Sequence, residues 1–315
     1  MTIQKIYLPR ICLDSELKPM TGEFLGDEWI LHEIDFDCDI FDIDTGHKIL
    51  SFRKRRLKGF EENFRHFKRL AKPSRGRGAP AGPIDPNSPY WKTRQLVNTN
   101  GIRTGYLKKD GTPSKMLVSN HVVSSAIGYV DAIRGNLGVN LPCRLSSYTT
   151  SSLKSYEKSI PYMQQISRWY RKTHPEAYQS QMDRAMLKPQ YRIANTPFSS
   201  CTVNRTFRTA LHKDSGDFGG VACLTVLEHG LYNGGLFMLP AFGIGVNIRS
   251  GDILVANVHE YHSNSEIWTT DAQDLHNATL EKQFKDTLVG TVGTGLDYSR
   301  ISMVLYLREK MSECV

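Results

Sequence analysis

Short apolar runs separated by glycine-rich turns fill the chain from Phe198 onward. They predict strands, because β-strands are short and bounded by turn residues. The runs lie at 200–204, 222–227, 236–239, 243–248, 253–256 and 301–307, with glycine turns at 233–235 and 250–252. This spacing suits two sheets packed as a jelly roll, a fold that buries a pocket between its sheets.

Helical periodicity precedes these strands. Between 151 and 189, apolar residues recur on one predicted helix face: Leu153, Tyr156, Ile160, Met163, Ile166, Trp169 and Tyr170. A second apolar stripe over 53–71 also has helical spacing. The expected fold class is therefore α+β, a jelly-roll core with supporting helices packed on one sheet.

The N-terminal part has a mixed pattern. Residues 1–52 are predicted to be β-rich, with strands at 29–31, 40–43 and 49–52. Residues 72–89 are rich in Pro and Gly and are typical of a linker. We predict an N-terminal segment over 1–90, packed on a jelly-roll core over 91–315. Within that core we expect a helix at 122–133 and a strand at 144–149.

Positive charge is concentrated in one region. The net charge is +8, and residues 53–77 carry eleven Lys and Arg against two Glu. Such a region on a near-neutral body favours a polyanionic partner, most simply nucleic acid. The alternative is a solvated helix face followed by a flexible linker. The candidate contacts to the DNA backbone are Arg53, Lys54, Arg55, Arg56, Lys58, Arg75 and Arg77.

Cysteine usage and hydropathy indicate the compartment. The six cysteines are scattered without a Cys-x-x-Cys pair, so we expect reduced thiols. The N-terminus lacks a signal pattern, and the sequence has no run of about 18 apolar residues. We therefore expect an intracellular protein of the nucleus, nucleoid or host cytoplasm that is not secreted and has no membrane partner.

The main candidate for chemistry is His212-Lys213-Asp214. In an extended segment His212 and Asp214 face the same way and can grip one side of a metal ion. Two histidines and one carboxylate form the ligand set of non-haem Fe(II) oxygenases. Either His259 or His262 can supply the third ligand, and His262 is favoured.

The last predicted strand has one polar face. Alternation places Arg300, Ser302, Val304, Tyr306 and Arg308 on it, and apolar residues on the other. We expect the polar face to line a cavity, where Arg300 can clamp a carboxylate such as that of 2-oxoglutarate and Ser302 can donate to it. Tyr306 can stack on a planar substrate. The alternative is a strand that faces solvent, with Arg300 in a structural ion pair.

Several motifs together resemble the TET/JBP family of Fe(II)/2-oxoglutarate dioxygenases, most closely its phage and viral branch. They cover about a third of the chain and lie at 202–204, 208–217, 232–235 with Pro240, 251–254, 259–264 and 300–306. The resemblance implies a double-stranded β-helix that uses Fe(II), 2-oxoglutarate and O₂ to hydroxylate the 5-methyl group of a pyrimidine in double-stranded DNA. Since a stacked base is out of reach of a buried iron, the nucleotide must be flipped out of the duplex.

By position, the resemblance makes His212, Asp214 and His262 the iron ligands. Arg300 becomes the 2-oxoglutarate clamp. Ser302, Arg208 and Asn204 become its helpers, and Tyr306 and Asp217 contact the flipped base.

Two departures from the family pattern matter. Arg308 stands where members that oxidise 5-methylcytosine carry a base-contacting His. This leaves the base open, because Asp217 can accept from cytosine N4 whereas Arg308 can donate to thymine O4. The 37 residues between His262 and Arg300 are a longer stretch than compact members have, and 269–283 within it is expected to be partly helical.

Two other functions remain open at this point. One is a 2-oxoglutarate dioxygenase that acts on RNA, a free nucleobase or a protein. The other is a nucleic-acid-binding jelly roll without catalysis. No protein partner is inferred.

Overall fold

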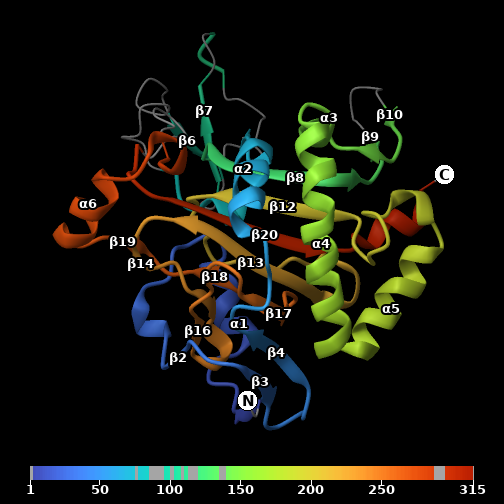
Figure 1. The fold of residues 1–315 in the computed structure, drawn as a ribbon, viewed down its shortest axis with the longest axis horizontal. Coiled ribbons are helices and arrows are strands. Elements are labelled where there is room, and N and C mark those ends of the chain that lie inside the picture. The colour runs from blue at the N-terminus through green and yellow to red at the C-terminus, as the bar shows by residue number, and fades with distance from the viewer. Residues whose placement is uncertain are drawn as a thin grey trace.

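Two sheets and a layer of helices make up the computed structural model of the chain (Figure 1). The structure describes residues 3–74, 77–84, 96–99, 103–107, 110–112, 120–134, 140–286 and 295–314. Arg75 and the stretch at 287–294 lie outside the described residues. No helix of the described part is long and apolar enough to span a bilayer.

The large sheet contains ten strands, most of them antiparallel. Its order is β1 (Gln4–Leu8), β3 (Cys38–Asp42), β4 (Lys48–Arg53), β17 (Ile253–Asn257), β13 (Val221–His229), β20 (Ser299–Tyr306), β12 (Ser200–Arg205), β8 (Val122–Val130) and β11 (Arg144–Leu145), with β5 (Pro73–Ser74) paired to β8. The last strand of the sequence, β20, lies between β13 and β12 in the middle of this sheet.

The small sheet has four strands and packs against one face of the large sheet. Its order is β18 (Ser263–Asn264), β15 (Phe237–Leu239), β16 (Ile244–Val246) and β2 (His32–Ile34). Three two-stranded ladders complete the β-structure: β9 (Ile133–Arg134) with β10 (Asn140–Leu141), β14 (Asn233–Gly234) with β19 (Ile267–Trp268), and β6 (Leu96–Thr99) with β7 (Arg103–Tyr106).

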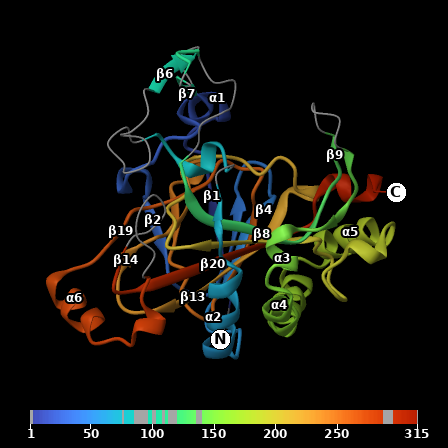
Figure 2. The same cartoon turned by 90° about the horizontal axis from the view of Figure 1, so that it is seen from above.

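The helices are α1 (Asp14–Leu17), α2 (Phe60–Leu70), α3 (Ser147–Thr150), α4 (Leu153–Thr173), α5 (Pro175–Met186) and α6 (Asp271–Ala278). The short 3₁₀ turns are η1 (Lys18–Met20), η2 (Asp27–Trp29), η3 (Ala79–Ala81), η4 (Pro189–Tyr191), η5 (Phe218–Gly220), η6 (Pro240–Phe242), η7 (Lys282–Phe284) and η8 (Glu309–Glu313). Helices α2 and α4 lie together on one face of the large sheet (Figures 1 and 2).

Two apolar cores lie on opposite faces of the large sheet. One fills the space between the sheets and includes Leu224 and Leu254 of the large sheet and Phe237 and Ile244 of the small one. The other joins α2 and α4 to residues of the large sheet, including Ile301, Met303 and Leu305 of β20. Because side chains alternate along a strand, the remaining residues of β20 point away from the helices. The predicted jelly-roll core with a helical support layer is confirmed.

The C-terminal strands and the helices of 151–189 form close to where the pattern predicts them. Three predictions upstream are wrong. Residues 122–130 form β8 instead of a helix, residues 147–150 form α3 instead of continuing a strand, and 29–31 is no strand. The helix expected from residue 53 begins at Phe60, because Arg53 is the last residue of β4.

The N-terminal segment joins the large sheet directly. Strand β4 pairs with β17, and β3 and β1 continue the sheet outward. A division of the chain near residue 90 stays a prediction.

The expectation of six reduced thiols is wrong for two of them. Cys143 and Cys314 form a disulfide across 171 residues, with their Cα atoms 5.8 Å apart. No short spacing marks such a pair in the sequence, because the fold alone brings η8 to the segment before β11. Cys12, Cys38, Cys201 and Cys223 are free.

One glycine gives a test of the packing of β8. Gly128 has a φ of +88°, and an added Cβ would lie 2.5 Å from the carbonyl oxygen of Ser199. We expect Gly128→Ala to lower the free energy of unfolding by about 1–3 kcal/mol. Chemical denaturation measures this, with Gly216→Ala as control because a methyl there meets no atom within 4 Å. Equal stability of the two variants would contradict the role assigned to Gly128.

Candidate metal centre and cavity

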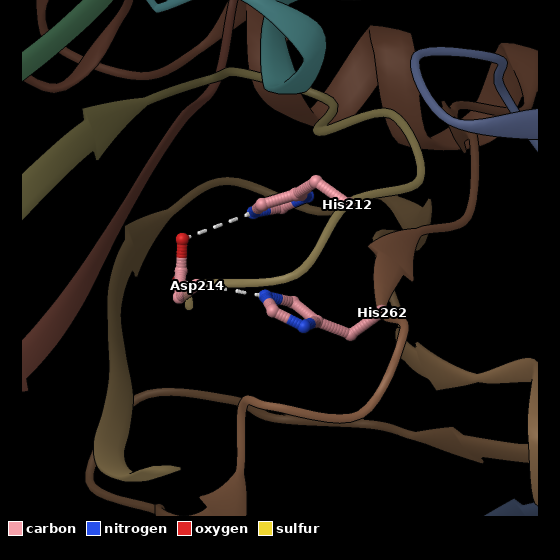
Figure 3. A group of neighbouring side chains, drawn as sticks. All are labelled: His212, Asp214 and His262. Atoms are coloured by element: carbon pink, nitrogen blue, oxygen red, sulfur yellow. Dashed lines mark ion pairs between the residues drawn. The ribbon is translucent and has the colours of Figure 1, made fainter. Parts of the chain in front are cut away.

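Two histidines and an aspartate converge at one end of the space between the sheets (Figure 3). Candidate ligand atoms of His212, Asp214 and His262 all lie within 4.8 Å of one another. Nε2 of His212 is 3.7 Å from Oδ1 of Asp214, and Nε2 of His262 is 3.6 Å from Oδ2. One ion placed among them would contact all three residues.

Backbone pairing sets this geometry. His212 and His262 form an antiparallel bridge with two hydrogen bonds, the amide of each residue donating to the carbonyl of the other at 3.0 and 2.9 Å. The amide of Asp214 donates to the carbonyl of Val258 at 3.0 Å. The segment is therefore extended, and its alternation turns His212 and Asp214 to the same side, as predicted.

Each imidazole is also fixed by its second nitrogen. Nδ1 of His212 lies 2.7 Å from the carbonyl of Ala210, and Nδ1 of His262 lies 2.9 Å from the carbonyl of Glu260. A carbonyl can only accept, so each Nδ1 carries the proton and each Nε2 presents a lone pair to the centre. This is the orientation that a metal-binding histidine requires.

The protonation states also fit a cation. Burial, helped by the neighbouring His262, lowers the pKa of His212 to about 4, so its ring is neutral at pH 7. Burial opposes ionisation of Asp214, but the two neighbouring imidazoles of His262 and His212 outweigh it and hold the pKa of that carboxyl well below its usual range. Neutral imidazoles and an ionised carboxylate are the forms that bind Fe(II).

His259 lies outside this cluster. Its Nε2 is 2.9 Å from the carbonyl of Asp217, and its ring packs against Gly220. The choice of His262 over His259 therefore agrees with the geometry.

A cavity of about 320 Å³ opens beside the cluster. The polar face of β20 lines it with Arg300, Ser302, Val304 and Tyr306, as the alternation predicts. Asn204 on the neighbouring strand lines it as well, and accepts a 2.5 Å hydrogen bond from Ser124.

Arg300 fits the part of a buried carboxylate clamp. Its side chain is 3% exposed and donates to the carbonyl of Gly235 at 3.0 Å, whereas its Nε has no hydrogen-bond partner among the described residues. A buried donor without a partner is costly, and an anion in the cavity would satisfy it. Gly235 allows this approach, because an added Cβ would lie 3.3 Å from the Arg300 Nε.

Another part of the cavity carries the residues predicted to contact a base. A backbone bridge pairs Asp217 with Arg308, and both side chains line the cavity. Burial, reinforced by the charge of Asp214, raises the pKa of Asp217 well above its ordinary range. Arg308 forms an ion pair of 2.7 Å with Asp131. The hydroxyl of Tyr306 lies 3.1 Å from Thr202 Oγ1, which fixes the position of its ring.

Arg208 is not brought to the cavity. Its guanidinium donates to the carbonyl of Leu25 at 2.8 Å and lies over the ring of Phe24. Among the described residues that line the cavity it is absent. The structure thus gives Arg208 a place in the scaffold and no contact with the space where a cofactor would bind.

The side chains of the basic region do not form the single DNA-binding surface that was predicted. The prediction for Arg53 is wrong, since its side chain is buried at 4% exposure and paired with Asp39 at 2.7 Å. Arg56 pairs with Asp37 and lies over Trp169 of α4, on the helical side of the sheet. Lys54, Arg55 and Lys58 occupy the same connection between β4 and α2 and are at least partly exposed.

Arg77 lines the cavity, although we predicted it as a backbone contact. Its Nε is buried without a partner among the described residues. Sequence reasoning missed this place because Arg77 stands in a Pro- and Gly-rich stretch, where no periodicity shows which way a side chain points. Thr209 and Asn264, which bond to each other in the cavity wall, were also missed.

The fold and the donor set together define a 2-oxoglutarate/Fe(II) oxygenase domain. The family Tet_JBP, described as the oxygenase domain of the 2OGFeDO superfamily, matches residues 126–309. The chain belongs to this family. Its superfamily uses Fe(II), 2-oxoglutarate and O₂, and the His-Asp-His cluster with Arg300 nearby fits these groups.

Two similar proteins are named thymine dioxygenases. Thymine dioxygenase JBP1-A of Trypanosoma cruzi (strain CL Brener) is 33% identical over 192 residues, which are 61% of this chain and 20% of that protein. Thymine dioxygenase JBP1 of Leishmania infantum is 31% identical over 201 residues, 64% of this chain and 21% of that protein. The chain therefore spans about a fifth of the length of these relatives.

A solved structure supports the fold. NgTET1 in complex with 5mC DNA superposes with a TM-score of 0.50 at 14% sequence identity, covering 93% of this chain and 82% of that one.

The two neighbouring histidines allow a sharp test of the metal centre. We expect His262→Ala and Asp214→Ala to lose stoichiometric Fe(II) binding, because each removes a ligand. His259→Ala should keep it, since its ring contacts the backbone of Asp217 instead. Calorimetric titration with Fe(II) under anaerobic conditions measures the difference. Retained binding in His262→Ala together with loss in His259→Ala would show that the ligand is the other histidine.

Proposed function

We propose that this protein hydroxylates the 5-methyl group of a pyrimidine in DNA, with thymine as the first candidate base. The observation that carries the proposal is the common cavity: the His212, Asp214 and His262 cluster, the Arg300 clamp and the base-edge pair Asp217 and Arg308 all face it. The thymine dioxygenases that resemble the chain support the choice of substrate.

The residues have separate tasks in this proposal. His212, Asp214 and His262 hold Fe(II), and Arg300 with Ser302 and Asn204 holds 2-oxoglutarate. When bound, these groups supply the activation of O₂ that hydroxylation of a C–H bond requires. The bridge between His212 and His262 keeps the ligands in register.

We assign recognition of the base to the part of the cavity that contains Tyr306, Asp217 and Arg308. Tyr306 offers a face on which a flipped base stacks, a contact worth about 1–3 kcal/mol, which offsets the cost of leaving the duplex. Arg308 is a donor only, so it suits O4 of thymine, the acceptor next to the 5-methyl group.

5-Methylcytosine is the second candidate. Asp217 has a buried oxygen, Oδ2, without a partner among the described residues. It can accept a hydrogen bond from N4 of cytosine, the donor that replaces O4 of thymine. Which of the two residues reaches atom 4 of the ring decides the preference.

DNA as substrate places the protein inside the cell, in the nucleus, the nucleoid or the host cytoplasm. The Cys143–Cys314 disulfide is unusual for a reducing compartment. We therefore propose that the catalytic residues do not depend on it, since neither cysteine lines the cavity that holds the metal cluster.

Nucleoside mass spectrometry tests the function. Purified protein, Fe(II), 2-oxoglutarate and duplexes that contain thymine with or without 5-methylcytosine should yield 5-hydroxymethyl bases and one succinate for each 2-oxoglutarate consumed. Asp214→Ala is the control and should yield neither product. Release of succinate without a modified nucleoside, from both duplexes, would point to a substrate other than DNA.

Arg308→Gln tests the reading of the base. A lost hydrogen bond from a charged donor costs about 1.5–3 kcal/mol, so kcat/KM for the thymine duplex should fall by about tenfold to a hundredfold. Turnover of 5-methylcytosine should fall much less. Asp131→Asn is the matched control, because it removes the ion-pair partner of Arg308 and leaves the guanidinium in place. An equal loss on both bases would assign Arg308 to the scaffold alone.

A further inference from the structure

Helices α2 and α4 present a basic surface on the side of the large sheet that faces away from the cavity. Residues Ile301, Met303 and Leu305 of β20 pack on these helices, whereas Arg300 and Ser302 line the cavity. The helices lie on one face of the large sheet (Figures 1 and 2), and the catalytic cavity therefore lies on the other face. A base held in the cavity and phosphates held on the helices cannot belong to the same few nucleotides.

The basic residues of α4 form a ridge along its outer side. Lys154, Lys158, Arg168 and Lys172 are all exposed. Their spacing keeps to one face of a helix with 3.6 residues per turn. The buried residues Met163 and Tyr170 lie on the opposite side of the same helix. The ridge is therefore turned to solvent over nearly the whole length of α4.

Helix α2 extends the basic surface sideways. It packs beside α4, and its exposed residues Arg65 and Arg69 follow each other by one turn. Burial lowers the pKa of His66 between the helices, and the nearby charges of Lys158 and Arg69 act in the same direction. The two helices thus combine their positive charges in one surface, which we call the helical basic face: Arg65, Arg69, Lys154, Lys158, Arg168 and Lys172.

These charges have no ionic partner in the described part of the chain, although Lys172 lies over the ring of Trp169. None of the six residues forms an ion pair with a described residue. The exposed acidic residues nearby are Glu61, Glu62 and Glu157, and the first two face His229 and His66. The surface keeps a clear positive excess without internal neutralisation.

Both imidazole nitrogens of His66 lie buried between the helices without a hydrogen-bond partner among the described residues. The side chain is 10% exposed. The carboxylate of Glu62 lies 3.8 Å from Nε2 of His66, so an oxygen acceptor that approached more closely would satisfy the ring.

We propose that the helical basic face binds the phosphate backbone of a second segment of duplex DNA, apart from the segment whose base enters the cavity. Helix α4 has 21 residues and is about 30 Å long, which matches about nine base pairs of duplex at 3.4 Å each. Such a site holds the enzyme on DNA without reading sequence, because phosphates carry no sequence information. The catalytic site then acts on a strand that passes the other face of the sheet.

Charge reversal on the ridge tests this surface. We expect Lys158→Glu combined with Arg168→Glu to weaken binding of a long unmodified duplex by about tenfold or more and to reduce the slope of log affinity against log salt by about two. The matched control is Lys5→Glu with Lys18→Glu, which changes the net charge equally on the exposed residues of β1 and η1. Fluorescence anisotropy at several salt concentrations measures both quantities.

Turnover on a short duplex separates this proposal from the proposed function. On a duplex of about ten base pairs, too short to reach both faces, the ridge variant should keep the wild-type kcat/KM. An unchanged salt slope, or an equal loss in the control pair, would overturn the proposal while leaving the catalytic function intact. Loss of binding to phosphatidylserine vesicles with no change in duplex affinity would also overturn it and assign the face to a membrane.

Discussion

Two backbone hydrogen bonds between His212 and His262 are the contact on which the rest of the site depends. The two histidines lie fifty positions apart in the sequence, and neither can bind a metal usefully alone. The bridge fixes their relative position before any ion arrives, and the carbonyls of Ala210 and Glu260 fix the rotation of each ring. Ligands held in advance do not lose conformational entropy when the metal binds. Burial of these polar side chains costs stability, and the packing of the two sheets around them must offset that cost.

Strand β20 divides the molecule by simple alternation. Its even-numbered residues line the cavity and Ile301, Met303 and Leu305 bind the helices, so one strand serves chemistry on one face and stability on the other. The strand is also paired on both sides, with β12 and β13. A central strand of this kind opens less readily than an edge strand, so it holds Arg300 rigidly. A clamp for a small anion benefits from this rigidity, because a displaced guanidinium would lose its bidentate geometry.

Most residues of the site could be predicted from local sequence patterns. The residues that could not be predicted are placed by packing between distant parts of the chain. The His212-x-Asp214 spacing and the polar face of 300–308 each follow from the two-residue period of a strand, which is a local property. The run at 122–130 shows where local pattern is not enough. Its apolar residues fit a helix or a strand, and pairing with β12 makes it a strand. The Cys143–Cys314 pair and the place of Arg77 depend on contacts across the whole chain, for which one sequence holds no signal.

The basic region shows that a run of Lys and Arg in a sequence does not by itself locate a binding surface. Its cations lie in different environments: Arg53 is buried against Asp39, Arg77 faces the cavity, Arg56 pairs with Asp37, and Arg65 and Arg69 join α4 on the outer helical surface. The ridge on α4 lies a hundred residues further along the chain, so no local window contains the complete surface. Since a phosphate backbone responds to the summed field of nearby charges, the surface that matters is the one the fold assembles, not the densest run of Lys and Arg. The large sheet has the cavity on one face and the helices on the other. It therefore also separates the site that selects a base from the surface that we propose holds the protein on DNA.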